Sequence, residues 1–378
     1  MRPSLPASSF VLLLLMGACA PPATVQPTAI STNPSGGTEP VRLSATDTAP
    51  LAATLASPTP APTFTPPART IPVIYDDDGS PDGTAALFYL LSHPEVSLRA
   101  IGISYGEAYP ASYIQHIGRK LDELGIEGIS LGAGQDAPLA GENEFPEWLR
   151  EGAEEFWGLP QSDTDEVYPA QNASDLIVSA VNSSPEPVTI FVSGPSTNLA
   201  QALRLDPQIR ENIAAVYIMG GAARVPGNID DLIPGAANRV AEWNIFADPQ
   251  AAKEVFESGL PIYLVPLDAT NQVSITREDT GWWEAGGGSA DFAAQVYNMM
   301  LDTWAGIEAP SWDLMTAAIL ARPDLCAFQP LNLEVDTGAG DTSGQTAVVS
   351  EGGSPIQVCL EPDVEGIKEE LGAVFSQS

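Results

Sequence analysis

The sequence IPVIYDDDGSPDG, residues 71–83, joins a short apolar run to four carboxylates within seven positions. Residues 71–75 are rich in β-formers and predict a strand, whereas residues 84–91 have the apolar spacing of a helix. A strand that passes through a polar loop into a helix is typical of α/β folds. The stretch therefore predicts an α/β domain whose first strand ends in an acidic loop.

The alternation of strands and helices continues along the chain. Further strands are predicted at residues 96–104, 129–133, 188–192, 215–219 and 261–267, and further helices at residues 112–124 and 249–258. This pattern predicts one α/β domain, residues 71–378, with a mostly parallel open sheet, helices on both faces and a Rossmann-like core. Ligands bind beyond the carboxyl ends of the strands in such sheets. Those ends carry Asp76–Asp78, Glu107, Thr197, Asn198, Met219 and Asp268.

The acidic loop predicts a cation site. Carboxylates packed at one strand end repel one another unless a cation or solvent offsets their charge. Hard oxygen ligands of this kind suit calcium or magnesium better than zinc. The chain's only histidines are His93 and His116, and its cysteines are far away in the sequence, which leaves no zinc site. The alternative from the loop alone is a solvated acidic turn.

Motifs farther along the chain occur in the order of a known family. They are Gly134–Leu139, Gly194–Asn198, Met219–Gly221, Ala241–Ile245, Asp248-Pro249, Leu267–Thr270 and Trp312-Asp313. With the acidic loop, they resemble the inosine–uridine-preferring nucleoside hydrolase family, whose signature after the first strand is D-x-D-P-G-x-D-D. The resemblance runs from residue 71 to the C-terminus. It implies a nucleoside hydrolase fold and cleavage of the N-glycosidic bond of ribonucleosides to ribose and a free base.

The resemblance also implies a bound calcium ion that holds the ribose 2′ and 3′ hydroxyls and a water molecule. By the same resemblance, Asp78 is a calcium ligand and the general base that takes a proton from the attacking water. Thr197 contributes its backbone carbonyl to the ion, and Asp313 contributes a carboxylate. Ribose contacts are implied at Asp82, Met219, Glu242 and Asn244, and supporting positions at Asp76 and Asn198.

Two positions depart from the family pattern. Gly83 stands where the family has its last motif aspartate, a strong calcium ligand, and Glu107 stands where the family usually has asparagine. We expect Glu107 to bind the metal in place of the missing carboxylate. Asp77 is an alternative, although strand alternation should point its side chain away from that of Asp78. A third reading is that the metal site has been lost.

The residue before Asp313 bears on how the base is bound. Some family members have a histidine there that protonates the leaving base, whereas this chain has Trp312, which can stack on a base. We expect a purine between Trp312 and Trp157, with Trp148 as the alternative second ring and core packing as the alternative role. Two other functions stay open, a non-catalytic nucleoside- or sugar-binding lipoprotein and a hydrolase of another N-riboside.

The N-terminus predicts export. Arg2 precedes an apolar run at residues 10–16, and small residues then lead to Cys19, which resembles a bacterial lipobox. We expect residues 1–19 to be a lipoprotein signal peptide, with a lipid on Cys19 that anchors the protein to the cell membrane outside the cytoplasm. An ordinary cleaved signal peptide is the alternative. Residues 20–70 are rich in Pro, Thr, Ala and Ser and predict a disordered tether.

Charge and cysteine content restrict the partners. The chain has 15 basic and 49 acidic residues and a net charge of −34, so it repels phosphate backbones and predicts no nucleic-acid partner. A small nucleoside and the membrane are the expected partners, and the resemblance implies a homo-oligomer. Outside the cytoplasm, Cys326 and Cys359 form either a disulfide or two buried thiols.

Overall fold

The computed structural model describes residues 70–377. The predicted signal peptide with Cys19, and residues 20–69 of the predicted tether, lie outside the described residues. Among residues 70–377, none of the helices combines the length and the apolar character that crossing a membrane requires.

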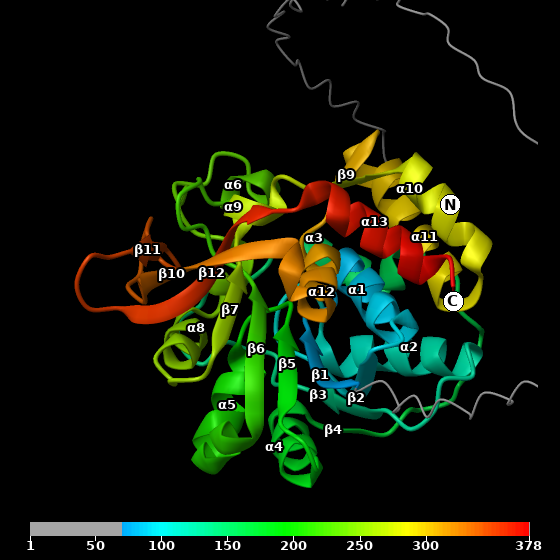
Figure 1. Cartoon of the computed structure of the whole chain (residues 1–378), viewed down its shortest axis with the longest axis horizontal. Coiled ribbons are helices and arrows are strands. Elements are labelled where there is room, and N and C mark those ends of the chain that lie inside the picture. Colours follow the sequence, from blue (N-terminus) through cyan, green and yellow to red (C-terminus); the bar gives the residue numbers. More distant parts are fainter. Residues whose placement is uncertain (1–69, 378) are drawn as a thin grey trace, which may run out of the picture. The chain divides into compact units, whose positions relative to one another are not determined.

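A ten-stranded sheet forms the centre of the described part (Figure 1). From edge to edge, its strands are β11 (Thr346–Val348), β10 (Cys326–Val335), β12 (Ser354–Pro362), β7 (Ile262–Val265), β6 (Ile213–Met219), β5 (Val188–Val192), β1 (Ile71–Asp77), β2 (Val96–Ile103), β3 (Ser130–Ala133) and β4 (Ala170–Asn172). All neighbours from β12 to β4 pair in parallel, whereas β10 pairs antiparallel with both β11 and β12. The predicted mostly parallel open sheet is confirmed.

Helices cover both faces of the sheet. The larger core lies under α1 (Pro81–Ser92), α2 (Pro110–Glu123), α11 (Gly288–Met300), α12 (Asp313–Ala321) and α13 (Val364–Phe375). The second core lies under α4 (Ala173–Ser183), α5 (Thr197–Leu205) and α8 (Pro249–Phe256). Shorter elements are α3 (Glu147–Glu154), α6 (Ile229–Leu232), α7 (Trp243–Ala247), α9 (Leu267–Thr270), α10 (Arg277–Trp283) and the paired strands β8 (Ser274–Thr276) and β9 (Glu308–Pro310).

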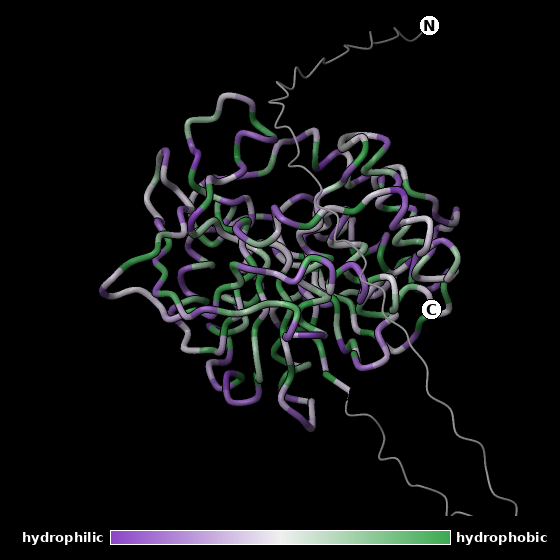
Figure 2. Tube along the Cα trace, turned by 45° about the horizontal axis from the view of Figure 1, so that its top comes forward, coloured by the Kyte–Doolittle hydropathy of each residue, from purple (hydrophilic) through white to green (hydrophobic). Residues whose placement is uncertain are grey.

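The central strands are buried on both sides, as parallel strands between two helical layers must be. In β1, Val73 and Tyr75 belong to the larger core and Ile74 to the second core. Successive side chains of a strand point to opposite faces, so one apolar run serves both cores. Figure 2 shows apolar residues concentrated along these central strands.

A tight connection carries β1 into α1. Gly79 has a φ of +88°, the left-handed region that favours glycine, and a Cβ there would lie only 2.4 Å from Cβ of Ala108. The Ser80 hydroxyl accepts a hydrogen bond from the amide of Gly83 (2.9 Å) and caps the helix. With Pro81 in the first turn, the helix begins at residue 81 rather than at the predicted residue 84. The acidic loop therefore lies at the carboxyl end of β1.

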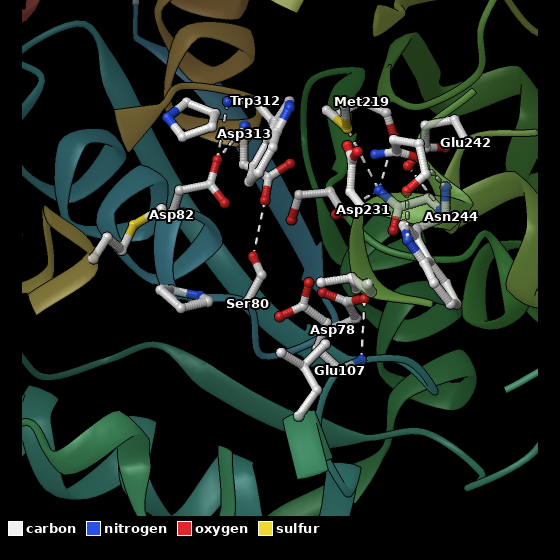
Figure 3. Close-up of a pocket in the computed structure, with 18 of the residues that line it drawn as sticks. Asp78, Ser80, Asp82, Glu107, Met219, Asp231, Glu242, Asn244, Trp312 and Asp313 are labelled. Carbon is white, nitrogen blue, oxygen red and sulfur yellow. Dashed lines mark hydrogen bonds between the residues drawn. The ribbon is translucent and has the colours of Figure 1, made fainter. Parts of the chain in front are cut away.

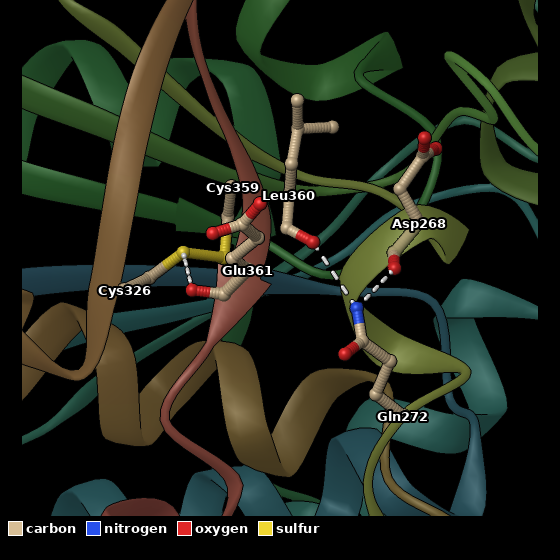
Figure 4. The surroundings of a disulfide bond; sticks show 6 residues. All are labelled: Asp268, Gln272, Cys326, Cys359, Leu360 and Glu361. Atoms are coloured by element: carbon tan, nitrogen blue, oxygen red, sulfur yellow. Dashed lines mark hydrogen bonds between the residues drawn. A yellow bond between two sulfur atoms is a disulfide. The ribbon is translucent and has the colours of Figure 1, made fainter.

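The C-terminal part adds antiparallel strands that the sequence pattern does not predict. Here Cys326 of β10 and Cys359 of β12 form a disulfide with their Cα atoms 5.9 Å apart (Figure 4). Gln272 donates from Nε2 to the carbonyl oxygens of Asp268 (2.7 Å) and Leu360 (3.1 Å). These contacts join β12 to the segment after β7. Of the two alternatives for the cysteines, the structure contains the disulfide.

Candidate functional site

A cavity of about 510 Å³ opens beyond the carboxyl ends of the parallel strands (Figure 3). Cavities of this size bind small molecules. Eight of the predicted site residues line it: Asp78, Asp82, Glu107, Met219, Glu242, Asn244, Trp312 and Asp313. The sheet topology thus brings together side chains that are more than 200 positions apart in the sequence.

Asp78 follows β1 and is only 1% exposed. Its Oδ2 accepts a hydrogen bond from the amide of Glu107 (3.3 Å), and its Oδ1 has no hydrogen-bond partner in the protein. A Cβ at Gly106 would lie 2.2 Å from Oδ2 of Asp78, and a Cβ at Gly194 would lie 2.5 Å from its Cβ. The two glycines therefore let the loops after β2 and β5 close around this carboxylate and hold it in place.

Asp82 and Asp313 join the acidic loop to the start of α12. Asp82 Oδ2 accepts hydrogen bonds from the amides of Trp312 (3.0 Å) and Asp313 (2.8 Å), where a helix N-terminus favours negative charge. Asp313 Oδ2 accepts a hydrogen bond from the Ser80 hydroxyl (2.9 Å), whereas its Oδ1 is buried without a partner. Asp78 and Asp313 therefore each bring one unpaired buried oxygen to the same cavity.

Glu242 and Asn244 hold another side of the cavity. Glu242 caps α7 by accepting hydrogen bonds from the amides of Asn244 (2.8 Å) and Ile245 (3.2 Å), and it also accepts one from the amide of Gly221 (2.9 Å) after β6. Asn244 Nδ2 lies within hydrogen-bond distance of the carbonyl oxygens of Ser193 (3.0 Å) and Met219 (3.2 Å). These contacts tie together the segments after β5 and β6 and fix three of the four residues predicted to contact the sugar, Met219, Glu242 and Asn244.

Four predicted residues lie outside the lining of the cavity, namely Asp76, Thr197, Asn198 and Trp157. Asn198 Nδ2 donates to Asp76 Oδ1 (2.8 Å), and Thr197 Oγ1 donates to Asp248 Oδ2 (2.7 Å). Asp76 also packs against Gly102, where a Cβ would lie 2.6 Å from its Oδ1. Asp76 and Asn198 thus support each other behind the acidic loop, and the metal contact of the Thr197 carbonyl stays a prediction.

The structure separates the tryptophans that were considered for base binding. Trp312 lines the cavity, and so does Trp148, which is 51% exposed on α3. Trp157 does not line it, because its side chain is buried and its Nε1 donates to the carbonyl oxygen of Gly79 (3.0 Å). The structure therefore corrects the predicted place of Trp157 beside the base: this side chain packs against the acidic loop, and the tryptophans that line the cavity are Trp148, Trp243 and Trp312.

Several residues that the sequence did not single out also line the cavity, among them Ser193, Asn228, Asp231, Trp243, Met300 and Glu308. Trp243 holds Asn228, because its amide donates to Asn228 Oδ1 (3.2 Å) and its indole Nε1 to Asn228 O (3.2 Å). The place of Trp243 between two predicted sugar contacts was a usable signal. Asn228 is the N-cap of the four-residue helix α6 and Asp231 lies within it, and a helix this short has no periodicity that marks them in the sequence.

Burial raises the pKa of the carboxyl groups around the cavity. Desolvation raises the pKa of Asp82 to about 7, that of Glu107 to about 8 and that of Asp76 to about 7. Desolvation and neighbouring carboxylates raise the pKa of Asp78 and Asp313 well above the usual range. In residues 70–377, no Lys, Arg or His lines the cavity to offset this charge, and no three Asp, Glu, His or Cys side chains are arranged as a preformed metal site.

Comparison with known proteins identifies relatives of the whole domain. Residues 73–369 match the family model described as inosine-uridine preferring nucleoside hydrolase. The chain is 31% identical over 284 residues to the pyrimidine-specific ribonucleoside hydrolase RihA of Citrobacter koseri, a match that covers 74% of this chain and 88% of that protein.

Solved structures agree with this match. The fold is similar to the purine-preferring ribonucleoside hydrolase from Gardnerella vaginalis, with a TM-score of 0.71, 25% identity and coverage of 81% of this chain and 98% of that one. It is also similar to the inosine-uridine preferring nucleoside hydrolase from Bacillus anthracis, with a TM-score of 0.68, 26% identity and coverage of 82% and 100%. The matched region contains every residue that lines the cavity. The chain therefore belongs to the inosine–uridine-preferring nucleoside hydrolase family and is a hydrolase of the ribonucleoside N-glycosidic bond.

Proposed function

We propose that the protein hydrolyses purine ribonucleosides with the help of a calcium ion and with Asp78 as the general base. The observation that carries this proposal is the pair of unpaired buried oxygens, Oδ1 of Asp78 and Oδ1 of Asp313, at one cavity that also contains Trp312. The oxygens supply ligands for a cation, and the tryptophan supplies a surface for a base.

The donor set fits calcium. Calcium binds six to eight oxygens from carboxylates, carbonyls and hydroxyls in flexible geometry, so a preformed cluster of three carboxylates is not required. We propose Asp78, Asp313 and Glu107 as carboxylate ligands and the backbone carbonyl of Thr197 as a further ligand. The lack of any basic side chain in the lining of this described cavity makes a divalent cation the natural counter-charge.

Each residue around the cavity then has a separate role in the reaction. A calcium ion held by these residues would orient the ribose 2′ and 3′ hydroxyls and would lower the pKa of a water molecule. Asp78 accepts a proton from the attacking water as the C1′–N bond breaks and a C1′–O bond forms. Carboxylates around the sugar stabilise the positive charge that develops on it in the oxocarbenium-like transition state. Asp82, Glu242 and Asn244 hold the sugar hydroxyls, and Met219 packs beside the ribose, so that the anomeric carbon faces the water.

The tryptophans favour a purine. Trp312 and Trp148 both line the cavity, and neither histidine of the described chain does. His93 pairs with Glu370, and His116 lies between Gln161 and the carbonyl of Glu154. Stacking of the base, rather than proton donation by histidine, is therefore the means by which this cavity recognises the leaving group.

A panel of nucleosides tests this proposal. We expect release of free base from inosine, adenosine and guanosine with at least tenfold higher kcat/KM than from uridine and cytidine, measured with calcium present. Faster turnover of uridine or cytidine, as the name of the Citrobacter koseri relative suggests for that enzyme, would overturn the purine preference alone. Binding of nucleosides by the folded protein without any turnover would instead favour a non-catalytic binding protein.

Removal of the Trp312 ring should harm purine turnover selectively. Stacking on an aromatic ring contributes about 1–3 kcal/mol per base, so we expect Trp312→Ala to lower kcat/KM for inosine by about 10–100-fold and for uridine by less. Trp282→Ala is the matched control, because Trp282 is 67% exposed and does not line the cavity. An equal loss for inosine and uridine would show that Trp312 does not select the base.

We also propose that the protein acts outside the cytoplasm, anchored through a lipid on Cys19. The support is the sequence alone, namely the apolar run, the small residues before Cys19 and the tether-like composition that follows. We expect the protein in the membrane fraction of the producing bacterium and a diacylated Cys19 at the mature N-terminus by mass spectrometry. Release of wild-type protein into the medium, cleaved elsewhere, would argue for an ordinary signal peptide.

A further inference from the structure

Position 83 has no room for a side chain. A Cβ placed on Gly83 would lie 2.1 Å from Oδ1 of Asp77 and 2.5 Å from Oγ of Ser80, closer than real Cβ contacts occur. The family signature has an aspartate at this position. In this protein, the volume that such a carboxylate would enter is already occupied by another carboxylate, that of Asp77.

The Asp77 carboxylate is fixed in that volume by neutral donors. It is 2% exposed, its Oδ1 accepts a hydrogen bond from Ser193 Oγ (2.8 Å), and the Tyr75 hydroxyl, which has one proton to donate, lies 3.1 Å from the same oxygen. Its Oδ2 accepts a hydrogen bond from the amide of Gly79 (3.1 Å). The Tyr75 hydroxyl also lies 2.8 Å from the carbonyl oxygen of Gly83, which ties the two positions together. None of the ion pairs in the described part includes Asp77.

Ser80 connects this arrangement to Asp313. Its hydroxyl accepts a hydrogen bond from the Gly83 amide (2.9 Å) and donates one to Asp313 Oδ2 (2.9 Å). Asp313 is 3% exposed and Asp78 is 1% exposed, and each has an unpaired Oδ1. Asp77, which has no ionic partner, thus adds negative charge close to Asp78 and Asp313, whose free oxygens are available to bind a cation.

Glu107 does not fill the same role. It lines the cavity from the loop after β2, whereas the space next to Gly83 is taken by Asp77 and Ser80. Asp77 is the last residue of β1 and is not among the residues that line the cavity, whereas Asp78 is, so the Asp77 carboxylate fills the space next to Gly83 without lining the cavity. A carboxylate from Glu107 therefore adds to the site without replacing the one missing at position 83.

We propose an exchange of carboxylates: Asp77 takes the place of the carboxylate that Gly83 lacks and supplies its negative charge. Ser80 contributes to this exchange by holding Asp313 in position. The inference rests on the calcium site proposed above and deepens it. The exchange lets the acidic loop retain a divalent cation although one motif aspartate is absent.

Removal of the charge alone is the first test. Asp77→Asn keeps the size of the side chain, and we expect it to raise the calcium dissociation constant at least tenfold, measured by isothermal titration calorimetry on the whole protein. Asp163→Asn is the matched control, because Asp163 is exposed and lies outside the cavity lining. Equal calcium affinity of Asp77→Asn and wild type would overturn the proposal.

Moving the carboxylate back is the second test. We expect Gly83→Asp alone to bind calcium poorly and to lower Tm, because the new side chain meets both Asp77 and Ser80. Asp77→Ser alone should also bind calcium poorly, whereas Gly83→Asp combined with Asp77→Ser and Ser80→Gly, which together clear the space at position 83, should recover affinity to within a few-fold of wild type. A combined variant no better than either single variant would overturn the exchange. Calcium binding without turnover in wild type would leave the exchange intact and overturn only the catalytic proposal.

Discussion

Replacement of Asp78 by asparagine should reduce the release of ribose from inosine by at least about 10³-fold, within the range of about 10²–10⁴-fold that a positioned general base contributes. Asp78 is the carboxylate that the loops after β2 and β5 enclose at the cavity, with Oδ1 free to accept a proton. Asparagine has the same shape but does not take a proton from water. The effect should therefore fall on kcat, with a smaller change in KM.

The same variant should remain folded. Burial raises the pKa of Asp78 well above its usual range, so the uncharged form is the one that this environment prefers. We therefore expect the Tm of Asp78→Asn without calcium to equal or exceed that of wild type. Asp163→Asn serves as the activity control. Turnover of Asp78→Asn within tenfold of wild type would assign the general base to another residue.

Removal of calcium should abolish turnover, and added calcium should restore it. The cavity gathers buried carboxylates without a basic side chain among its lining residues, so their charge needs a cation before the sugar can bind productively. Asp313→Asn should raise the calcium concentration for half-maximal activity more than about tenfold, because even the loss of an outer contact of a metal site costs about 10–100-fold in affinity. Full activity in the presence of a strong chelator would exclude calcium from the mechanism.

The calcium concentration for half-saturation of the protein should also depend on pH and should be lower at higher pH. Desolvation raises the pKa of the proposed ligand Glu107 to about 8, and desolvation with neighbouring carboxylates raises the pKa of Asp78 and Asp313 well above the usual range, so these ligands hold protons at pH 6 in the calcium-free protein. Calcium binds the deprotonated groups, so protons compete with the ion. The calcium concentration for half-saturation, measured by calorimetry, should therefore fall as the pH rises from 6 to 8. An increase over this range would contradict the proposed carboxylate site.

The sequence pattern determines some features of this protein, and only the tertiary structure determines others. The apolar run before Asp76 predicts a buried strand that ends at a ligand edge, and the alternation of strands and helices predicts the parallel sheet. These features follow from local periodicity, which is set by side-chain direction along a strand or helix. The ordered motifs predict eight residues that the structure then brings to one cavity.

Other features depend on contacts between distant segments. The sequence favoured Trp157 over Trp148 as the second ring beside the base, yet Trp148 lines the cavity and Trp157 packs against Gly79. In the sequence, Gly83 indicates a lost carboxylate. In the structure, the Asp77 carboxylate occupies the space that a side chain at position 83 would enter. The residues of one strand, loop and helix thus determine the type of fold and the chemistry available. Only the folded chain decides which side chain fills a given volume, because that depends on neighbours that are close in space and far apart in sequence.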